Sequence, residues 1–135
     1  MNEKHIPYQK RLNHSEDFKV KYRFYSKSEG GRKQLPFQGL RSDFWYENEN
    51  HTMKGIFMIW PEFENENGEL IESGVVLKEG IARMWIINDD LREYHQDRII
   101  IGTKGYFMEG VRTGECEVIE IVGLNSNPVK NEKSG

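Results

Sequence analysis

The chain has 135 residues, of which 36% are hydrophobic and 30% charged, and its net charge is −3. This length predicts one domain. The single cysteine, Cys116, excludes a disulfide framework, a zinc ribbon and a Cys-x-x-Cys redox pair. No apolar run approaches the ~20 residues of a membrane helix, and no apolar signal core follows Met1. We therefore expect a cytoplasmic protein without a membrane partner.

The charge is divided unequally along the chain. Residues 1–41 hold ten basic residues against four acidic ones, a balance of +6, whereas the remainder holds nine against eighteen, a balance of −9. A basic segment of this kind can face a polyanion such as RNA. The two halves can also lie side by side in a sheet and pair their charges locally. This second interpretation is favoured, because segregation along a sequence often disappears in the fold.

The first predicted strand follows a lead-in without hydrophobic periodicity. Residues 1–17 are therefore predicted to be an irregular N-terminal arm. Across residues 18–25 hydrophobic and basic side chains alternate, which predicts a strand with one solvent-facing side. The adjacent Gly30 and Gly31 then allow positive φ angles and predict a structural turn.

Further short strands are predicted by runs of β-branched and aromatic residues between turn signals. They cover residues 44–46, 55–60, 81–88, 98–101 with 106–107, and 118–122. The glutamates within residues 62–72 predict a solvated acidic loop, and residues 89–97 form the one helical candidate. The polar end, residues 125–135, is predicted to be a flexible tail.

Six or seven short strands without a helical period indicate an all-β domain over residues 18–124. We expect a mostly antiparallel, closed β-barrel, because closure leaves no strand edge exposed. The residues predicted to point into this barrel are Val20, Tyr22, Phe24, Phe44, Ile56, Met58 and Ile119.

The sequence offers little catalytic chemistry. It has no Walker or dinucleotide motif, and its histidine spacing does not place two ligands on one helix face. We therefore expect no catalytic residues, no cofactor, no metal site and no nucleotide, and hence a protein that is not an enzyme. His95, near carboxylates, remains a remote candidate for a catalytic or small-ligand site. Cys116 is interpreted as a small strand residue, and Trp45 and Trp60 as core or rim packing.

The densest local signal lies in residues 28–46, which begin with Glu29-Gly30-Gly31-Arg32. This segment resembles the opening of the C-terminal barrel, the third domain, of bacterial elongation factor Tu and related translation GTPases. The aligned matches are Glu29, Gly30, Gly31, Arg32, Phe37, Arg41 and Phe44. Three later pieces follow in the same order, and one of them, Lys78-Glu79-Gly80, falls where that domain has Pro-Gly-Asp. Residues 60–62 are similar to that domain's Leu-Pro-Glu, and residues 109–114 to its closing Glu-Gly-Gly-Arg-Thr-Val-Gly.

The resemblance implies a six-stranded, antiparallel, closed barrel of the elongation factor Tu type. By position it also implies contacts with phosphate, RNA or a partner for Arg32, Lys33, Arg41, Arg112, Thr113 and Gly114. The family's GTPase domain is not in this sequence, so we expect no GTP hydrolysis. Asp43 stands where the family has a tRNA-facing glutamine, and a carboxylate there would repel RNA.

Two functions follow from these observations. The favoured hypothesis is a non-enzymatic binding module, a stand-alone relative of the elongation factor Tu barrel with a protein partner and a link to translation. It explains the retained scaffold glycines and the altered RNA-facing positions. The alternative is an accessory protein that binds a tRNA-like RNA through the basic residues of segment 19–41, which explains the +6 segment better.

Overall fold

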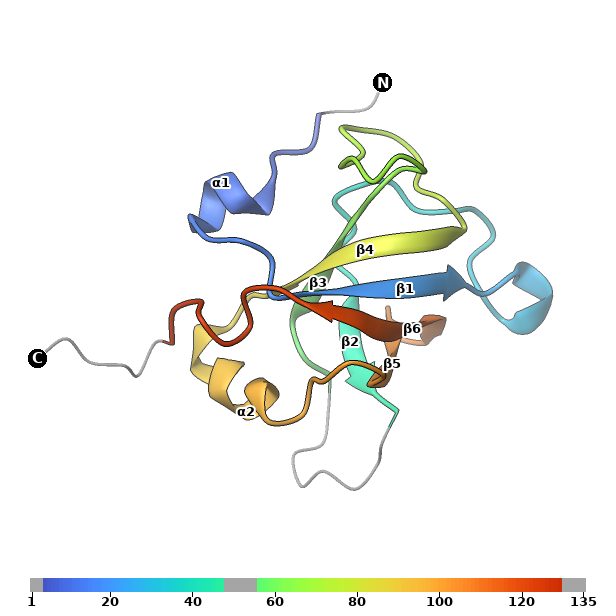
Figure 1. Ribbon diagram of the computed structural model, residues 1–135. Coiled ribbons are helices and arrows are strands. Elements are labelled where there is room, and N and C mark those ends of the chain that lie inside the picture. Colours follow the sequence, from blue (N-terminus) through green and yellow to red (C-terminus); the bar gives the residue numbers. More distant parts are fainter. Residues whose placement is uncertain (1–3, 48–55, 130–135) are drawn as a thin grey trace, which may run out of the picture.

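The computed structural model describes residues 4–47 and 56–129, which form one antiparallel sheet with short helices at its margins (Figure 1). The strands are β1 (Phe18–Phe24), β2 (Asp43–Tyr46), β3 (Ile59–Phe63), β4 (Glu79–Ile86), β5 (Lys104–Met108) and β6 (Arg112–Ile121). Their order across the sheet is β2-β5-β6-β1-β4-β3. The predicted all-β class, with six antiparallel strands, is confirmed.

The helices are all short. They are α1 (Tyr8–Leu12), α2 (Arg92–Gln96) and two single turns of 3-10 helix, η1 (Lys27–Glu29) and η2 (Asp89–Leu91). The helix predicted over residues 89–97 is confirmed as η2 followed by α2, with the Asn88 side chain accepting a hydrogen bond from the Asp90 N–H. Within the described ranges no helix has the length and apolar character needed to cross a membrane.

The sheet curls through 230° without closing, so the predicted closed barrel is wrong. Among the described residues, β2 meets the segment leading into β3 at one backbone bridge, where Phe44 and Phe57 exchange two hydrogen bonds of 2.9 Å. Further along, a side chain covers the edge of β3. Gln38 Nε2 donates to the carbonyl oxygens of Phe63 (2.9 Å) and Ile71 (2.7 Å), and Gln38 Oε1 accepts from the Phe63 N–H (2.9 Å). Gln38 thus satisfies backbone groups that a neighbouring strand would otherwise satisfy.

The residues predicted to point inward divide into two groups. Four are buried: Val20, Tyr22, Phe24 and Phe44. Three are exposed, by 49%, 45% and 37% respectively: Ile56, Met58 and Ile119. In each failed case the adjacent residue is the buried one, Phe57, Ile59 or Val118. A continuous apolar run does not reveal which alternate positions face the core, and an error of one residue reverses the two faces.

The N-terminal segment is more ordered than the predicted irregular arm. Residues 8–12 form α1, and Tyr8 is buried against Trp85 of β4, with ring centres 5.7 Å apart. Tyr8 N–H also donates to Glu62 Oε2 (2.8 Å), and the His5 ring contacts the same oxygen. Contacts with β3 and β4, which are distant in sequence, therefore order this segment. Residues 1–3 of the predicted arm lie outside the described residues.

The first part of the predicted flexible tail is packed into the structure. Asn127 is 8% exposed, and its Nδ2 donates to Ser15 O and to Asp17 Oδ1, both at 2.9 Å. Leu124 is fully buried. The chain therefore returns to the start of β1 beyond residue 124, the predicted end of the domain, through Asn127. Residues 130–135 lie outside the described part of the chain.

Two further local predictions are corrected. Glu62 and Glu64, predicted to lie in a solvated loop, are buried, with exposures of 1% and 4%; Glu62 belongs to β3, and Glu64 directly follows it in an isolated bridge with Leu70. Their carboxylates find donors on other elements, including Trp85 Nε1 for Glu62 (2.9 Å) and Arg83 Nε for Glu64 (2.9 Å). Residues 98–101, predicted as a strand, belong instead to the irregular connection between α2 and β5, and Ile101 is 66% exposed there.

Candidate binding surface

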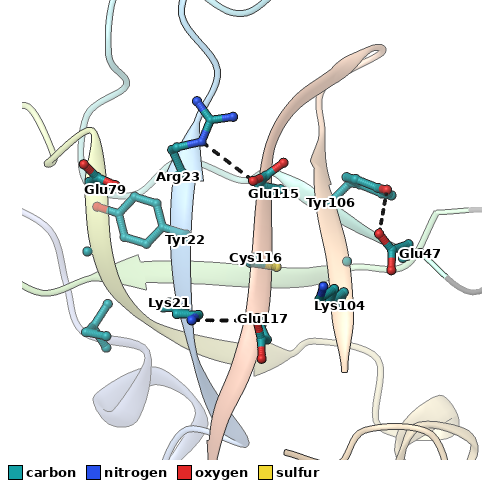
Figure 2. Close-up of a pocket in the computed structure, with 13 residues that line it drawn as sticks. Lys21, Tyr22, Arg23, Glu47, Glu79, Lys104, Tyr106, Glu115, Cys116 and Glu117 are labelled. Carbon is teal, nitrogen blue, oxygen red and sulfur yellow. Dashed lines mark hydrogen bonds and ion pairs between the residues drawn. The ribbon is translucent and has the colours of Figure 1, made fainter. Parts of the chain in front are cut away.

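A shallow trough crosses the outer face of the sheet over β4, β1, β6 and β5 (Figure 2). Its floor is one row of paired residues, Gly80, Tyr22, Cys116 and Gly105. Successive side chains in a strand point to opposite faces, so this row directs its side chains into the core and leaves backbone at the surface. A Cβ atom on Gly105, for example, would lie 2.4 Å from the Phe44 ring inside the sheet. The trough has a volume of about 660 Å³.

Two rows of outward-pointing side chains form the walls of the trough. They are Glu79, Arg23, Glu115 and Tyr106 on one side, and Ile81, Lys21, Glu117 and Lys104 on the other. Figure 2 shows the ion pairs within these walls: Arg23 Nε lies 3.7 Å from Glu115, and Lys21 Nζ lies 3.8 Å from Glu117. Acidic and basic groups alternate, so the trough offers no single sign of charge to a ligand.

The basic residues of β1 are paired with glutamates from the acidic part of the chain. Lys19 Nζ lies 3.1 Å from Glu64, the residue that follows β3, while Lys21 and Arg23 contact β6 as described above. The segregation seen in sequence thus disappears between neighbouring strands. For β1, the favoured interpretation of local charge pairing is confirmed, and the strip from Lys19 to Arg23 is not an open basic track.

The Glu29-Gly30-Gly31-Arg32 turn is held by its own polar contacts. Arg23 donates to both carboxylate oxygens of Glu29, at 3.0 and 3.1 Å, and the Ser26 N–H donates to Glu29 Oε1 at 2.8 Å. These bonds, with that of Arg23 the largest, lower the pKa of Glu29 to about 2. Gly30 has φ 92°, and a Cβ on Gly31 would lie 2.3 Å from Tyr25 O. Both glycines therefore have the structural turn role predicted for them.

Arg112 begins β6 and lies over two aromatic rings at one end of the trough wall. Its guanidinium carbon is 3.8 Å from the centre of the Tyr106 ring and 5.6 Å from that of Trp45. The two rings are brought together by the β2–β5 register, which pairs Trp45 with Tyr106. Arg112 is exposed and makes no ion pair with any carboxylate of the described residues. Stacking therefore positions this cation while its N–H donors remain available.

Arg41 has the same kind of environment on the other side of β2. Its guanidinium carbon lies 5.1 Å from the centre of the Trp60 ring, and Trp60 Nε1 donates to Asp43 Oδ1 at 3.0 Å. Asp43 and Trp45 are alternate residues of β2, so both point to its outer face. The two stacks therefore belong to one region, which we call the arginine–aromatic surface. It comprises Arg41, Asp43, Trp45, Trp60, Tyr106 and Arg112.

The other predicted contact residues are placed differently. Arg32 forms an ion pair with Glu109, in the turn between β5 and β6, and Arg32 Nε donates to Gln34 O at 3.1 Å. Lys33 is exposed on the following loop. Arg32 therefore lies beside the β5–β6 hairpin, which leads to Arg112. Arg41 lies on the other side of β2, against Trp60. Arg32 has a carboxylate partner of its own, which distinguishes it from Arg41 and Arg112.

Thr113 and Gly114 are structural residues of the hairpin. Thr113 is 3% exposed, and its carbonyl accepts a hydrogen bond from the Tyr25 N–H (2.9 Å). Gly114 is buried, and a Cβ there would lie 2.8 Å from Arg23 O. That both contact a ligand stays a prediction, and the buried Thr113 side chain gives it no support. They allow β1, β5 and β6 to approach closely.

His95 and Cys116 are core residues. His95 is 1% exposed, and its Nδ1 lies 2.6 Å from the Tyr46 hydroxyl. Burial, with smaller contributions from Arg98 and Arg92, lowers the pKa of His95 to about 3. Burial likewise raises the pKa of Cys116, which is consistent with its interpretation as a small strand residue. Across residues 4–47 and 56–129, no three His, Cys, Asp or Glu side chains gather as a metal-binding group.

The sequence alone did not predict that the aromatic residues of the arginine–aromatic surface, Trp45, Trp60 and Tyr106, belong to a binding site. Trp45 and Trp60 were assigned to core or rim packing, and Tyr106 was placed only as a strand residue. The available signal was the alternation of Asp43 and Trp45 with the buried Phe44, which places the first two on the solvent side. The pairing of Trp45 with Tyr106 depends on strand register, which the sequence does not show.

Comparison with known proteins adds no relative to this description. No protein-family model matches the sequence, and no curated protein matches it.

Proposed function

We propose that this chain is a non-enzymatic binding module, related to the C-terminal barrel of elongation factor Tu, that binds a protein partner through the arginine–aromatic surface. One observation carries the proposal. Arg41 and Arg112 are exposed, stacked on aromatic rings, and without ion pairs to the described carboxylates. The relationship to the barrel is supported by the six antiparallel strands and by the glycine turn after β1.

The residue types of the surface support a protein partner. Tryptophan, tyrosine and arginine are the residues that most often dominate the binding energy of protein interfaces. Trp45, Trp60 and Tyr106 are partly exposed, and their rings are held by strand pairing or by a hydrogen bond. A rigid aromatic side chain loses little conformational entropy when a partner covers it.

The charges around the surface make RNA the weaker alternative. Nucleic acid binding depends on neutralising several phosphates with free lysines and arginines. Here Lys19, Lys21 and Arg23 are paired with glutamates. Asp43 lies within the surface itself, and Glu47 lies next to it, bonded to the Tyr106 hydroxyl at 3.2 Å. These carboxylates would repel a phosphate backbone.

The proposal is tested by capture of a partner at physiological salt after RNase treatment. The wild-type chain should retain a defined protein from a lysate of the source organism, and Trp45→Ala should lose it. Ile101→Ala is the matched control, since it shortens an exposed apolar residue in the turn before β5. Retention by Trp45→Ala, or loss with the control, would contradict the proposed surface.

The RNA alternative is tested in parallel by measuring the affinity of the chain for bulk tRNA across a salt series. If RNA were the partner, tRNA affinity would fall steeply with salt, and Arg32→Ala or Lys33→Ala would flatten that dependence. We expect no such binding at physiological salt. A steep salt dependence reduced by these substitutions would replace our proposal with the RNA alternative.

A further inference from the structure

We infer that the arginine–aromatic surface binds an acidic segment of its protein partner, with carboxylates accepting hydrogen bonds from Arg41 and Arg112. This inference rests on the proposed function and adds the chemistry of the partner. Three observations support it: Arg41 and Arg112 lack the carboxylate partners that other arginines have, both guanidinium groups are stacked on aromatic rings, and carboxylates lie close to both stacks.

Four arginines differ from these two because each has a carboxylate partner within the chain. Arg23 pairs with Glu29, Arg32 with Glu109, Arg83 with Glu64, and Arg92 with Asp17. Arg41 and Arg112 instead lie against the faces of Trp60 and Tyr106. An arginine on an aromatic face directs its edge away from the ring, and that edge carries the paired N–H donors that match a carboxylate. Arg41 also shares a side-chain hydrogen bond with Tyr8, so part of its edge is used within the chain.

The stacking also prepares the two arginines for binding. A free arginine side chain loses substantial rotamer entropy when it binds, and part of that loss has already occurred where a ring holds the guanidinium. The Arg112 guanidinium has two rings nearby, Tyr106 at 3.8 Å and Trp45 at 5.6 Å. Trp60, beneath Arg41, is fixed in turn by its hydrogen bond to Asp43. Both cations thus stand on rigid supports from the same region.

The neighbouring carboxylates favour a singly charged acceptor over a phosphate. Asp43 lies beside the Arg41 stack, and Glu47 accepts from the Tyr106 hydroxyl beside the Arg112 stack. Repulsion from these groups increases with the charge of the ligand, and a phosphate monoester carries close to two charges at neutral pH. A carboxylate carries one charge and accepts the same bidentate pair of hydrogen bonds.

The test is selection from a random library of 12-residue peptides displayed on phage, run in parallel on three forms of the folded chain. These are the wild type, the double variant Arg41→Gln with Arg112→Gln, and the control Arg98→Gln. Arg98 also stacks on a ring, that of Tyr94, but beyond α2 and away from the surface. Thermal melting of each form verifies that it is folded.

We expect peptides selected on the wild type and on Arg98→Gln to be enriched in aspartate and glutamate, and we expect this enrichment to disappear on the double variant. The highest-ranking peptide, synthesised with its acidic residues changed to Asn or Gln, should bind the wild type at least about tenfold more weakly. A version with phosphoserine in place of one acidic residue should bind no more tightly than the original.

Three results would overturn the inference. They are selected peptides without acidic enrichment, enrichment that persists on the double variant, and failure to select any peptide, since a linear acidic segment is what we infer. Tighter binding of the phosphoserine version would assign the surface to phosphate instead of carboxylate. The partner-capture experiment is independent of these outcomes. Capture that depends on Trp45 would leave the proposed function standing after a failed selection.

Discussion

Asp17 and Arg92 form an ion pair in which both side chains are fully buried, with Arg92 Nε 3.0 Å from Asp17 Oδ1. The pair joins the residue before β1 to the first residue of α2, and Asn127 Nδ2 donates to the same Asp17 oxygen at 2.9 Å. Asp17 Oδ2 also accepts from the Ile86 N–H at the end of β4 (2.8 Å). Four distant segments therefore meet at one carboxylate.

Arg92→Ala should lower the free energy of unfolding by about 3–5 kcal/mol, because it leaves the Asp17 charge buried without its cation. Urea denaturation followed by tryptophan fluorescence measures this change. Arg23→Ala is the control, since its partner Glu29 is exposed and the loss of stability should be much smaller. Equal effects of the two substitutions would show that the buried pair has no special role.

Gln38→Ala should lower the free energy of unfolding by about 2–4 kcal/mol, because it leaves the Phe63 N–H and the Ile71 carbonyl without this partner at the sheet edge. Hydrogen exchange should also become faster at the Phe63 amide. Gln34→Ala, in the preceding exposed loop, is the control and should change neither quantity. An unchanged Phe63 exchange rate would mean that the edge is protected by other means.

Gly31→Ala should destabilise the chain more than Gly30→Ala. A Cβ on Gly31 would lie 2.3 Å from Tyr25 O, so the backbone must move, whereas Gly30 has open space around it. Gly30→Ala incurs only the strain of an L-residue at φ 92°, about 1–2 kcal/mol. Thermal melting of the two variants compares them directly, and the reverse order would be incompatible with the packing of this turn.

His95 should make stability depend on pH. Its folded-state pKa of about 3 lies below the value of about 6.5 for an unfolded chain. The contribution of neutral His95 is therefore complete above about pH 6.5 and decreases as the pH falls toward 3, by roughly 1.4 kcal/mol per pH unit. Urea denaturation between pH 7 and 5 should show this slope in the wild type and a smaller one in His95→Gln. NMR signals of the His95 ring that titrate near pH 6.5 would contradict the prediction.

The fold class could be predicted from the sequence because strands and turns are indicated by patterns among neighbouring residues. Alternation along residues 18–24 and the glycine pair after them predicted β1 and its turn correctly. The prediction of a closed barrel failed because it depends on how β2 and β3 meet, which is a long-range contact: among the described residues the two edges approach at the Phe44–Phe57 bridge, and Gln38 covers the edge of β3 at Phe63. Glu62 was misplaced for the same reason, since its donors Tyr8 and Trp85 lie on other elements.

The candidate surface was predicted only in part. Arg41 and Arg112 were named from the resemblance, but their role depends on the rings beneath them. Tyr106 and Trp45 come together through the register of β2 and β5, and Trp60 reaches Asp43 across the gap where the sheet does not close. Neither arrangement has a signature in the spacing of residues along the chain.

The most direct measurement of the central claim is the affinity of the captured, purified partner for the wild type and for Arg112→Gln at physiological salt. We predict that the substitution weakens binding at least about tenfold, since an arginine anchored between aromatic residues is typical of an interface hot spot. The control Arg98→Gln should bind with wild-type affinity. Equal affinities for the wild type and Arg112→Gln would contradict the claim that the arginine–aromatic surface binds the partner.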